Sequence, residues 1–223
     1  MPARQPSDLH AVLFLSTCLL LACGRCAADE PKPTPENTIS IHLEEPVAPQ
    51  KFERPPKLWI TDITDRSGNP QPMLVMKARG GVFLDKQPTA IVKESLEDSL
   101  KAANLLAADA DSAGLVLRIY LFHFGLAEGS GLDFFGKVEF SVLVKNPKTG
   151  ESQEVMAAGT SIAKGAARKK NIEKNVKEDI EEALHDSMRN FLRGQQLKDA
   201  VAALSAGTGA APSSGSSPSG TSK

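Results

Sequence analysis

The sequence has little cysteine, few aromatic rings and almost no excess charge, and each shortage excludes a class of protein. All three cysteines stand before residue 27 of 223, so no disulfide framework holds the rest together and the domain must rely on an apolar core. One Trp and one Tyr make a stacking platform for nucleotide bases improbable. A formal net charge of -1 is unlike the basic surface of a nucleic-acid-binding protein, so we expect no nucleic acid among its partners.

No long apolar run is present either, but a short one stands near the N-terminus. Residues 11–22 are apolar apart from Ser16 and Thr17. This run is shorter than the roughly 20 residues of a transmembrane helix, and it suits the apolar core of a signal peptide. Residues 1–22 are therefore expected to be a signal peptide.

The residues that follow this run, Leu20-Leu21-Ala22-Cys23, resemble the lipobox of bacterial lipoproteins. The resemblance implies cleavage before Cys23, a diacylglyceryl group on its sulfur and further acylation, which together anchor a protein stably. Gly24 stands where many inner-membrane lipoproteins carry Asp. By that analogy, we expect an outer-membrane protein that faces the periplasm and contacts the membrane through its N-terminal lipid.

Two other interpretations of this segment remain open. Cys23 and Cys26 form a C-x-x-C pair, the spacing of thioredoxin-like redox sites, although such a pair normally belongs to a βαβ unit. The second alternative is an ordinary secretory signal, cut near Ala22 without lipid.

Composition divides the mature chain into three parts. Residues 23–56 hold seven prolines from Pro31 onward, which predicts an extended, lipid-anchored linker with a reach of about 90 Å for some 30 residues. Within it, the alternating segment Ile39 to Leu43 could add an edge strand. Residues 57–200 are expected to form the folded domain, and the Ser/Gly-rich residues 201–223 a disordered tail.

Hydrophobic periodicity predicts the elements of the folded part. Alternating residues predict strands at 57–63, 115–122, 138–144 and 152–163, with a further short one at 82–84. Apolar residues at helical spacing predict a helix that begins at Pro88 and a long helix over 172–191 with Asn171 as its N-cap. We therefore expect an α+β fold, with an antiparallel sheet of about four strands and two helices packed on one face.

Several short patterns match catalytic motifs but stand in the wrong context. Gly131 to Lys137 fits G-x-x-x-x-G-K, but a strand follows instead of a helix. Ser161 to Lys164 fits S-x-x-K and Lys148 to Gly150 fits K-T-G, but in the reverse of the order found in penicillin-recognising enzymes. The four His residues are scattered, and Asp109 and Asp111 lack the rest of a calcium loop. We expect no catalytic residue, metal or cofactor.

Two surface features are candidate partner-binding or anion-binding sites. Basic residues gather around the start of the last predicted helix and could meet an anionic glycan, lipid or protein: Lys164, Arg168, Lys169, Lys170, Lys174 and Lys177. The alternative is a solvated face balanced by neighbouring glutamates. The second feature is the Phe134-Phe135 pair, which either marks an interface or packs beneath the sheet edge.

With these features in place, the chain resembles the YajG-like family of small envelope lipoproteins. The resemblance covers roughly residues 57–195 and depends on the lipobox, the strand at 58–63, the strand-rich stretch 115–163 and the last helix. The Pro-rich linker and the Ser/Gly tail depart from compact members. The resemblance implies a non-enzymatic protein. We therefore expect an envelope lipoprotein that binds or positions another envelope component, with an envelope protein or peptidoglycan as its partner. The alternatives are an accessory lipoprotein of a transporter or peptidoglycan synthase, and a cryptic envelope hydrolase.

Overall fold

Four strands form the main sheet in the computed structural model, which describes residues 32–68, 74–76, 81–128, 134–161 and 171–206. They are β2 (Leu58–Asp65), β5 (Leu115–Glu128), β6 (Phe134–Lys145) and β7 (Ser152–Thr160), in the order β2-β5-β6-β7. Each carries buried apolar side chains at alternate positions, as a half-buried strand requires. The predicted α+β class and four-stranded sheet are confirmed.

One pairing differs from the expected antiparallel arrangement. β5, β6 and β7 are antiparallel neighbours, but β2 lies parallel to β5, with Leu58 opposite Leu115 and Ile63 opposite Ile119. The connection between these strands contains helix α2 (Pro88–Ala102), and such a helical crossover returns the chain in the same direction. The sheet is therefore mixed.

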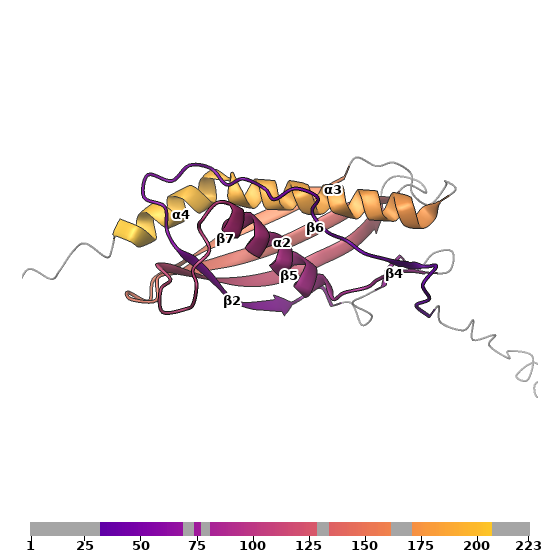
Figure 1. Ribbon diagram of the computed structural model, residues 1–223, viewed down its shortest axis with the longest axis horizontal. Coiled ribbons are helices and arrows are strands. Elements are labelled where there is room, and N and C mark those ends of the chain that lie inside the picture. Colours follow the sequence, from indigo (N-terminus) through magenta and orange to yellow (C-terminus); the bar gives the residue numbers. More distant parts are fainter. Residues whose placement is uncertain (1–31, 69–73, 77–80, 129–133, 162–170, 207–223) are drawn as a thin grey trace, which may run out of the picture. The chain divides into compact units, whose positions relative to one another are not determined.

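Helices α2 and α3 (Ile172–Leu192) cover one face of the sheet (Figure 1). Leu96 and Leu100 of α2 and Ile180 and Leu184 of α3 are fully buried in a single cluster with the inward side chains of the strands. Phe191 meets Phe140 of β6 edge to face, at 6.0 Å between ring centroids. The predicted helix from Pro88 and the predicted long helix are both present.

Two glycines let α3 lie unusually close to the sheet. A methyl group on Gly136 of β6 would overlap the carbonyl group of Asp179, and one on Gly159 of β7 would overlap the backbone of Ala183 and Ser187. These positions thus accept only a hydrogen atom unless the helix moves away.

A second, smaller sheet lies at one end of the domain. It contains β1 (Thr38–Ile39), β4 (Val82–Leu84) and β3 (Leu74–Met76), in the order β1-β4-β3. The short strand expected at 82–84 is present. Of the possible strand over Ile39 to Leu43, Ile39 alone is in a strand, as the second residue of β1.

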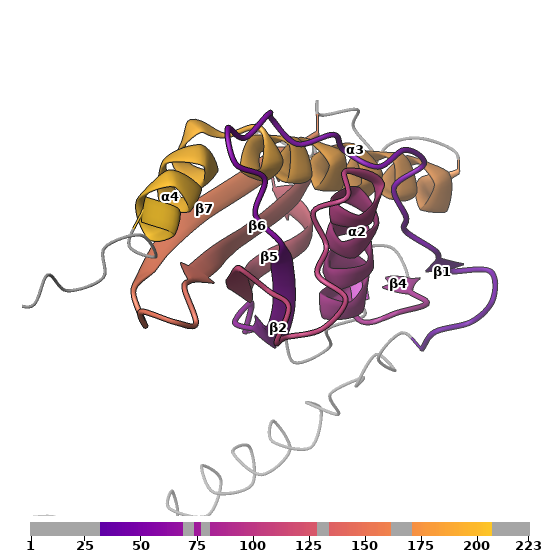
Figure 2. The same cartoon turned by 60° about the vertical axis from the view of Figure 1, so that its left-hand side comes forward.

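Part of the expected linker belongs to the folded domain, which begins at Pro33. Residues 40–57, called the strap below, run along the helices from β1 to β2 (Figure 2). Ile41 and Val47 are buried and belong to the same hydrophobic cluster as the inward side chains of α2 and α3. The prolines in this segment favour an extended chain, but they do not prevent it from packing.

The C-terminal boundary also differs from the expectation. Helix α4 (Gln195–Ala206) follows α3 directly, so residues 201–206 are helical and are not part of a tail. Its side chains Leu197, Val201 and Leu204 are buried, and this apolar stripe explains why the helix docks. Among the described residues, no helix is both long and apolar enough to cross a membrane.

Candidate functional site

The two motifs that resemble phosphate-binding and hydrolase sequences contact each other. Ser161 is 7% exposed, and its Oγ accepts a hydrogen bond from the amide of Gly136 at 2.8 Å. The amide of Ser161 in turn donates to the carbonyl of Gly136 at 2.9 Å. Both hydrogen bonds extend the pairing of β6 with β7, so the Ser161 hydroxyl and the Gly136 amide stabilise the sheet. Lys164 lies outside the described residues.

The other residues that match catalytic motifs, Lys137 and the K-T-G segment, also have structural partners. The Nζ of Lys137 lies 2.7 Å from a carboxylate oxygen of Glu139 on the same strand. In the K-T-G segment, the side-chain oxygen of Asn146 accepts hydrogen bonds from the amides of Lys148 and Thr149. This is an Asx-type turn between β6 and β7.

His123 and the Asp109 turn each have local partners that account for their side chains. His123 lies on β5 opposite Glu139, and its pKa is lowered by burial and by the charge of Lys137, against the opposing effect of Glu139. Asp109 accepts a hydrogen bond from the amide of Ser112 at 2.7 Å, and hydrogen bonding to Ser112 lowers the pKa of this exposed carboxylate. Within the described ranges, no three His, Cys, Asp or Glu residues cluster as a metal site would require.

Of the six basic residues in the predicted anion-binding cluster, the structure describes two, Lys174 and Lys177. Lys174 is exposed on the first turn of α3, and its Nζ lies 3.8 Å from a carboxylate oxygen of Glu178. Arg168, Lys169 and Lys170 lie outside the described residues, as does the lipidation candidate Cys23. Lys177 pairs in the same i,i+4 manner with Glu181, at 3.6 Å. The described part of the cluster is thus balanced by glutamates.

Phe134 and Phe135 begin β6 opposite Glu128 and Ala127 of β5. Both rings are half-buried, and Phe134 packs against the main core. The pair therefore supports the end of the sheet, and neither ring is fully exposed as a free anchor.

The open face of the sheet, away from the helices, carries its own apolar residue. Among the described residues, Met156 on β7 is the one large hydrophobic side chain that is exposed, at 49%. On the same face, Tyr120 of β5 is covered by Arg66, whose guanidinium carbon lies 3.9 Å from the ring centroid. Arg66 thus shields one part of this face and leaves the region around Met156 open.

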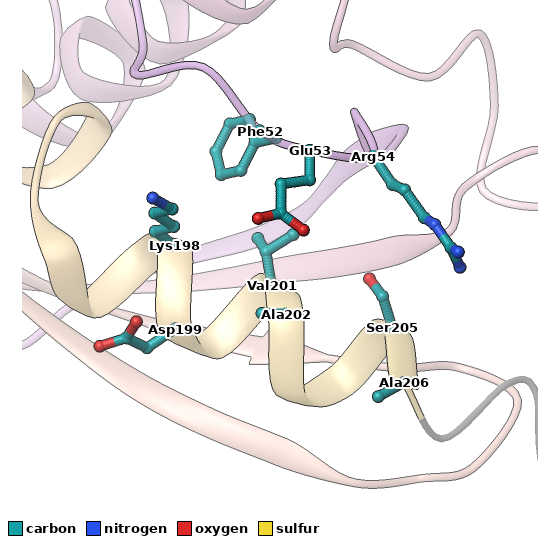
Figure 3. Close-up of a pocket in the computed structure, with 9 residues that line it drawn as sticks. All are labelled: Phe52, Glu53, Arg54, Lys198, Asp199, Val201, Ala202, Ser205 and Ala206. Carbon is teal, nitrogen blue, oxygen red and sulfur yellow. The ribbon is translucent and has the colours of Figure 1, made fainter.

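A groove lies between the strap and α4 (Figure 3). Its volume is about 400 Å³, within the size range of small-molecule and peptide sites. Phe52 and Val201 provide apolar surface, while Glu53 extends from the strap toward α4. Arg54, Lys198 and Asp199 add charges of both signs, which suits an amphipathic protein segment better than a strongly charged ligand.

A second depression, of about 450 Å³, lies between the strap and the middle of α3 and is lined mainly by acidic side chains. His42 and His185 stand at its edges. The amide of His42 donates to a carboxylate oxygen of Glu181 at 3.4 Å, and the imidazole Nδ1 lies 3.7 Å from that oxygen. Glu181 thus links the strap to α3.

The groove includes residues that the sequence interpretation missed. Phe52 to Arg54 were assigned to a linker, and Val201 to Ala206 to a tail. A signal for α4 was present, since Leu197, Val201 and Leu204 recur at helical spacing. No comparable periodicity marks Phe52, because the strap packs as an irregular segment.

The fold is shared with a solved structure, although sequence comparisons find no relative. No protein-family model matches the chain, and no curated protein matches it. Protein XCC0632 from Xanthomonas campestris, of the family DUF330, is similar over 73% of this chain and 96% of its own, with 12% identity and a TM-score of 0.56.

Two bacterial lipoproteins are more distant structural matches. A putative lipoprotein from Caulobacter crescentus covers 70% of this chain and 94% of its own at 13% identity, with a TM-score of 0.37. Lipoprotein GNA1162 from Neisseria meningitidis covers 56% and 94% at 14% identity, with a TM-score of 0.27. The chain has the α+β fold of XCC0632.

Proposed function

We propose that the protein is a non-catalytic lipoprotein of the cell envelope, anchored in the outer membrane by lipid on Cys23, and that it binds or positions another envelope component. The observation that carries the proposal is the Leu20-Leu21-Ala22-Cys23 sequence at the end of a signal-peptide-like run. This arrangement is what a lipid anchor requires. Membership of the YajG-like family is part of the same proposal.

The roles of the motif residues support a binding function over an enzymatic one. A hydrolase needs an accessible nucleophile beside a general base, whereas the Ser161 hydroxyl is buried and accepts the Gly136 amide. The groove between the strap and α4 offers a surface for an envelope protein.

Replacing Cys23 tests the anchor. The Cys23→Ala chain should leave the membrane fraction and lose incorporation of labelled palmitate, because the thiol that accepts the lipid is gone. Cys26→Ala is the matched control and should remain membrane-bound and labelled. Retention of the Cys23→Ala chain in membranes would contradict lipidation at this position.

A second experiment separates binding from hydrolysis. A photo-crosslinking amino acid at Ala202 in the groove should capture a reproducible envelope partner in intact cells, while the same amino acid at Lys148 should capture less of it. Ser161→Ala and Lys164→Ala should leave any esterase or amidase activity of the preparation unchanged. Loss of such activity in a folded variant would instead support the hydrolase alternative.

A further inference from the structure

Strand β7 forms an outer edge of the main sheet, because β6 is its neighbour on one side and it is the last strand in the order. The amide of Ser161, which follows β7, donates to the carbonyl of Gly136 on β6. The carbonyl of Ala158 and the amide of Thr160 instead meet side chains of α3. Since these directions alternate along a strand, the even-numbered residues of β7 point their amide and carbonyl groups away from β6.

The first half of this edge is unpaired. Among the described residues, no hydrogen bond reaches the outward backbone groups of Ser152, Glu154 and Met156. All three side chains are exposed, and Met156 is the exposed large hydrophobic residue described above. In the second half, α3 occupies the outward groups of Ala158 and Thr160. The free edge is therefore short and ends at a defined residue.

A second copy of β7 fits this edge, because two identical edges related by a two-fold axis use the same free groups on both sides. The position of the axis follows from charge and from the groups that α3 occupies. An axis at Glu154 would place two like-charged carboxylates directly opposite each other, which is unfavourable. An axis at Met156 would place Glu154 and Ser152 opposite Ala158 and Thr160, whose outward groups already bond to α3. An axis at Val155 avoids both arrangements for the central pairs.

We propose that the protein forms a two-fold dimer in which β7 pairs antiparallel with β7 of a second copy, centred on Val155. Glu154 of each copy then lies opposite Met156 of the other, and each of these residue pairs exchanges two hydrogen bonds. The exposed thioether of Met156 is covered in the process. Asp186 and Asn190 of α3 keep the groups that they occupy and so limit the pairing to the first half of β7. This inference is independent of the lipid proposed at Cys23.

Charge substitutions at Met156 test both the dimer and its register. Sedimentation velocity of the full chain in a mild detergent, over a concentration series, should show a monomer–dimer equilibrium. Met156→Glu places a carboxylate opposite Glu154 of the second copy at two symmetric positions, so the dissociation constant should rise roughly tenfold. Met156→Lys is the matched control, because it removes the same apolar side chain but places a cation opposite Glu154. It should retain the dimer.

A double substitution completes the test. Glu154→Lys combined with Met156→Glu reverses the charges and should restore the dimer that Met156→Glu weakens. Thermal unfolding of the dilute variants should match that of the unsubstituted chain, because both positions are exposed. A chain that stays monomeric at every concentration would overturn the proposal. Equal weakening by Met156→Glu and Met156→Lys, or no recovery in the double variant, would overturn the register and with it the proposed pairing.

Discussion

The side-chain nitrogen of Asn190 lies 2.8 Å from the carbonyl oxygen of Ala158, so helix α3 bonds directly to the outer edge of β7. A carboxylate oxygen of Asp186 lies 3.4 Å from the amide of Thr160 two residues further along the strand. Unpaired groups on an edge strand invite pairing with another chain. The two side chains of α3 occupy such groups at one end of this edge.

Replacing Asn190 should therefore expose the edge. We expect Asn190→Ala to lower the free energy of unfolding by about 1 kcal/mol and to increase concentration-dependent association of the protein. Thermal unfolding and light scattering over a concentration series would measure the two effects. His185→Ala, at an exposed position of the same helix, should change neither. If Asn190→Ala associates no more than the unsubstituted protein, the hydrogen bond from Asn190 to Ala158 does not protect the edge strand.

Adding a methyl group beneath α3 should destabilise the domain. Gly159→Ala places Cβ against the backbone of Ala183 and Ser187, so the helix must shift, at a cost of about 1–3 kcal/mol. Gly114→Ala is the matched control, because its Cβ would lie 3.6 Å from the nearest atom. Urea unfolding should separate the two variants, and equal stabilities would contradict the close approach.

Asn146 fastens α4 to the β6–β7 turn. Its side chain makes three hydrogen bonds, with Leu204, Lys148 and Thr149, and the residue is 1% exposed. Asn146→Ala should leave the carbonyl of Leu204 unpaired and cost about 1–3 kcal/mol. Amide hydrogen exchange should accelerate in α4 more than in α2. Thr149→Ala, in the exposed part of the turn, should leave α4 protected, and uniform exchange in Asn146→Ala would argue against this local role.

His123 should make stability depend on pH in the mildly acidic range. Burial and the charge of Lys137 lower its pKa below the ordinary value of 6.5, so the unfolded chain binds a proton at a higher pH than the folded one. Stability rises with pH wherever the unfolded state holds more protons. It should therefore fall as the pH drops below 6.5 toward the folded pKa, and then lose this dependence.

Substitutions at two positions would isolate this effect. His123→Gln should remove its share of the decline, measured as the unfolding free energy between pH 7 and pH 5. Lys137→Met should raise the pKa of His123, since it removes the cation and leaves Glu139. An NMR titration of the imidazole would show the direction in which the pKa moves. A pKa of His123 at or above 6.5 in the unsubstituted protein would contradict the lowered pKa and the pH dependence expected from it.

The elements with strong periodicity could be predicted from the sequence. The alternation around Val138 to Val144 and the apolar stripe of α3 each match a buried face in the structure. The parallel pairing of β2 could not, because the alternation of a strand carries no information on its direction. Asn171 is at the N-cap position of α3, but its φ of 67° is left-handed and its side chain makes no capping bond.

The candidate site was less accessible to sequence reasoning. The groove depends on Phe52 and Val201, which lie in two segments whose composition is typical of linkers and tails. Composition describes what a segment prefers in isolation, whereas packing depends on what the neighbouring helices leave uncovered. Ser161 and Gly136 match short catalytic motifs in the sequence. In the structure, however, their hydrogen bond only extends the pairing of β6 with β7.

The parallel pairing of β2 with β5 also bears on how the main sheet forms. β2 precedes β3, β4 and α2 in the chain, yet its partner strand follows all three. Pairing the two strands therefore requires a long loop to close, and contacts of this long range slow folding. The antiparallel pairs of β5, β6 and β7 join neighbours in the chain and carry no such cost.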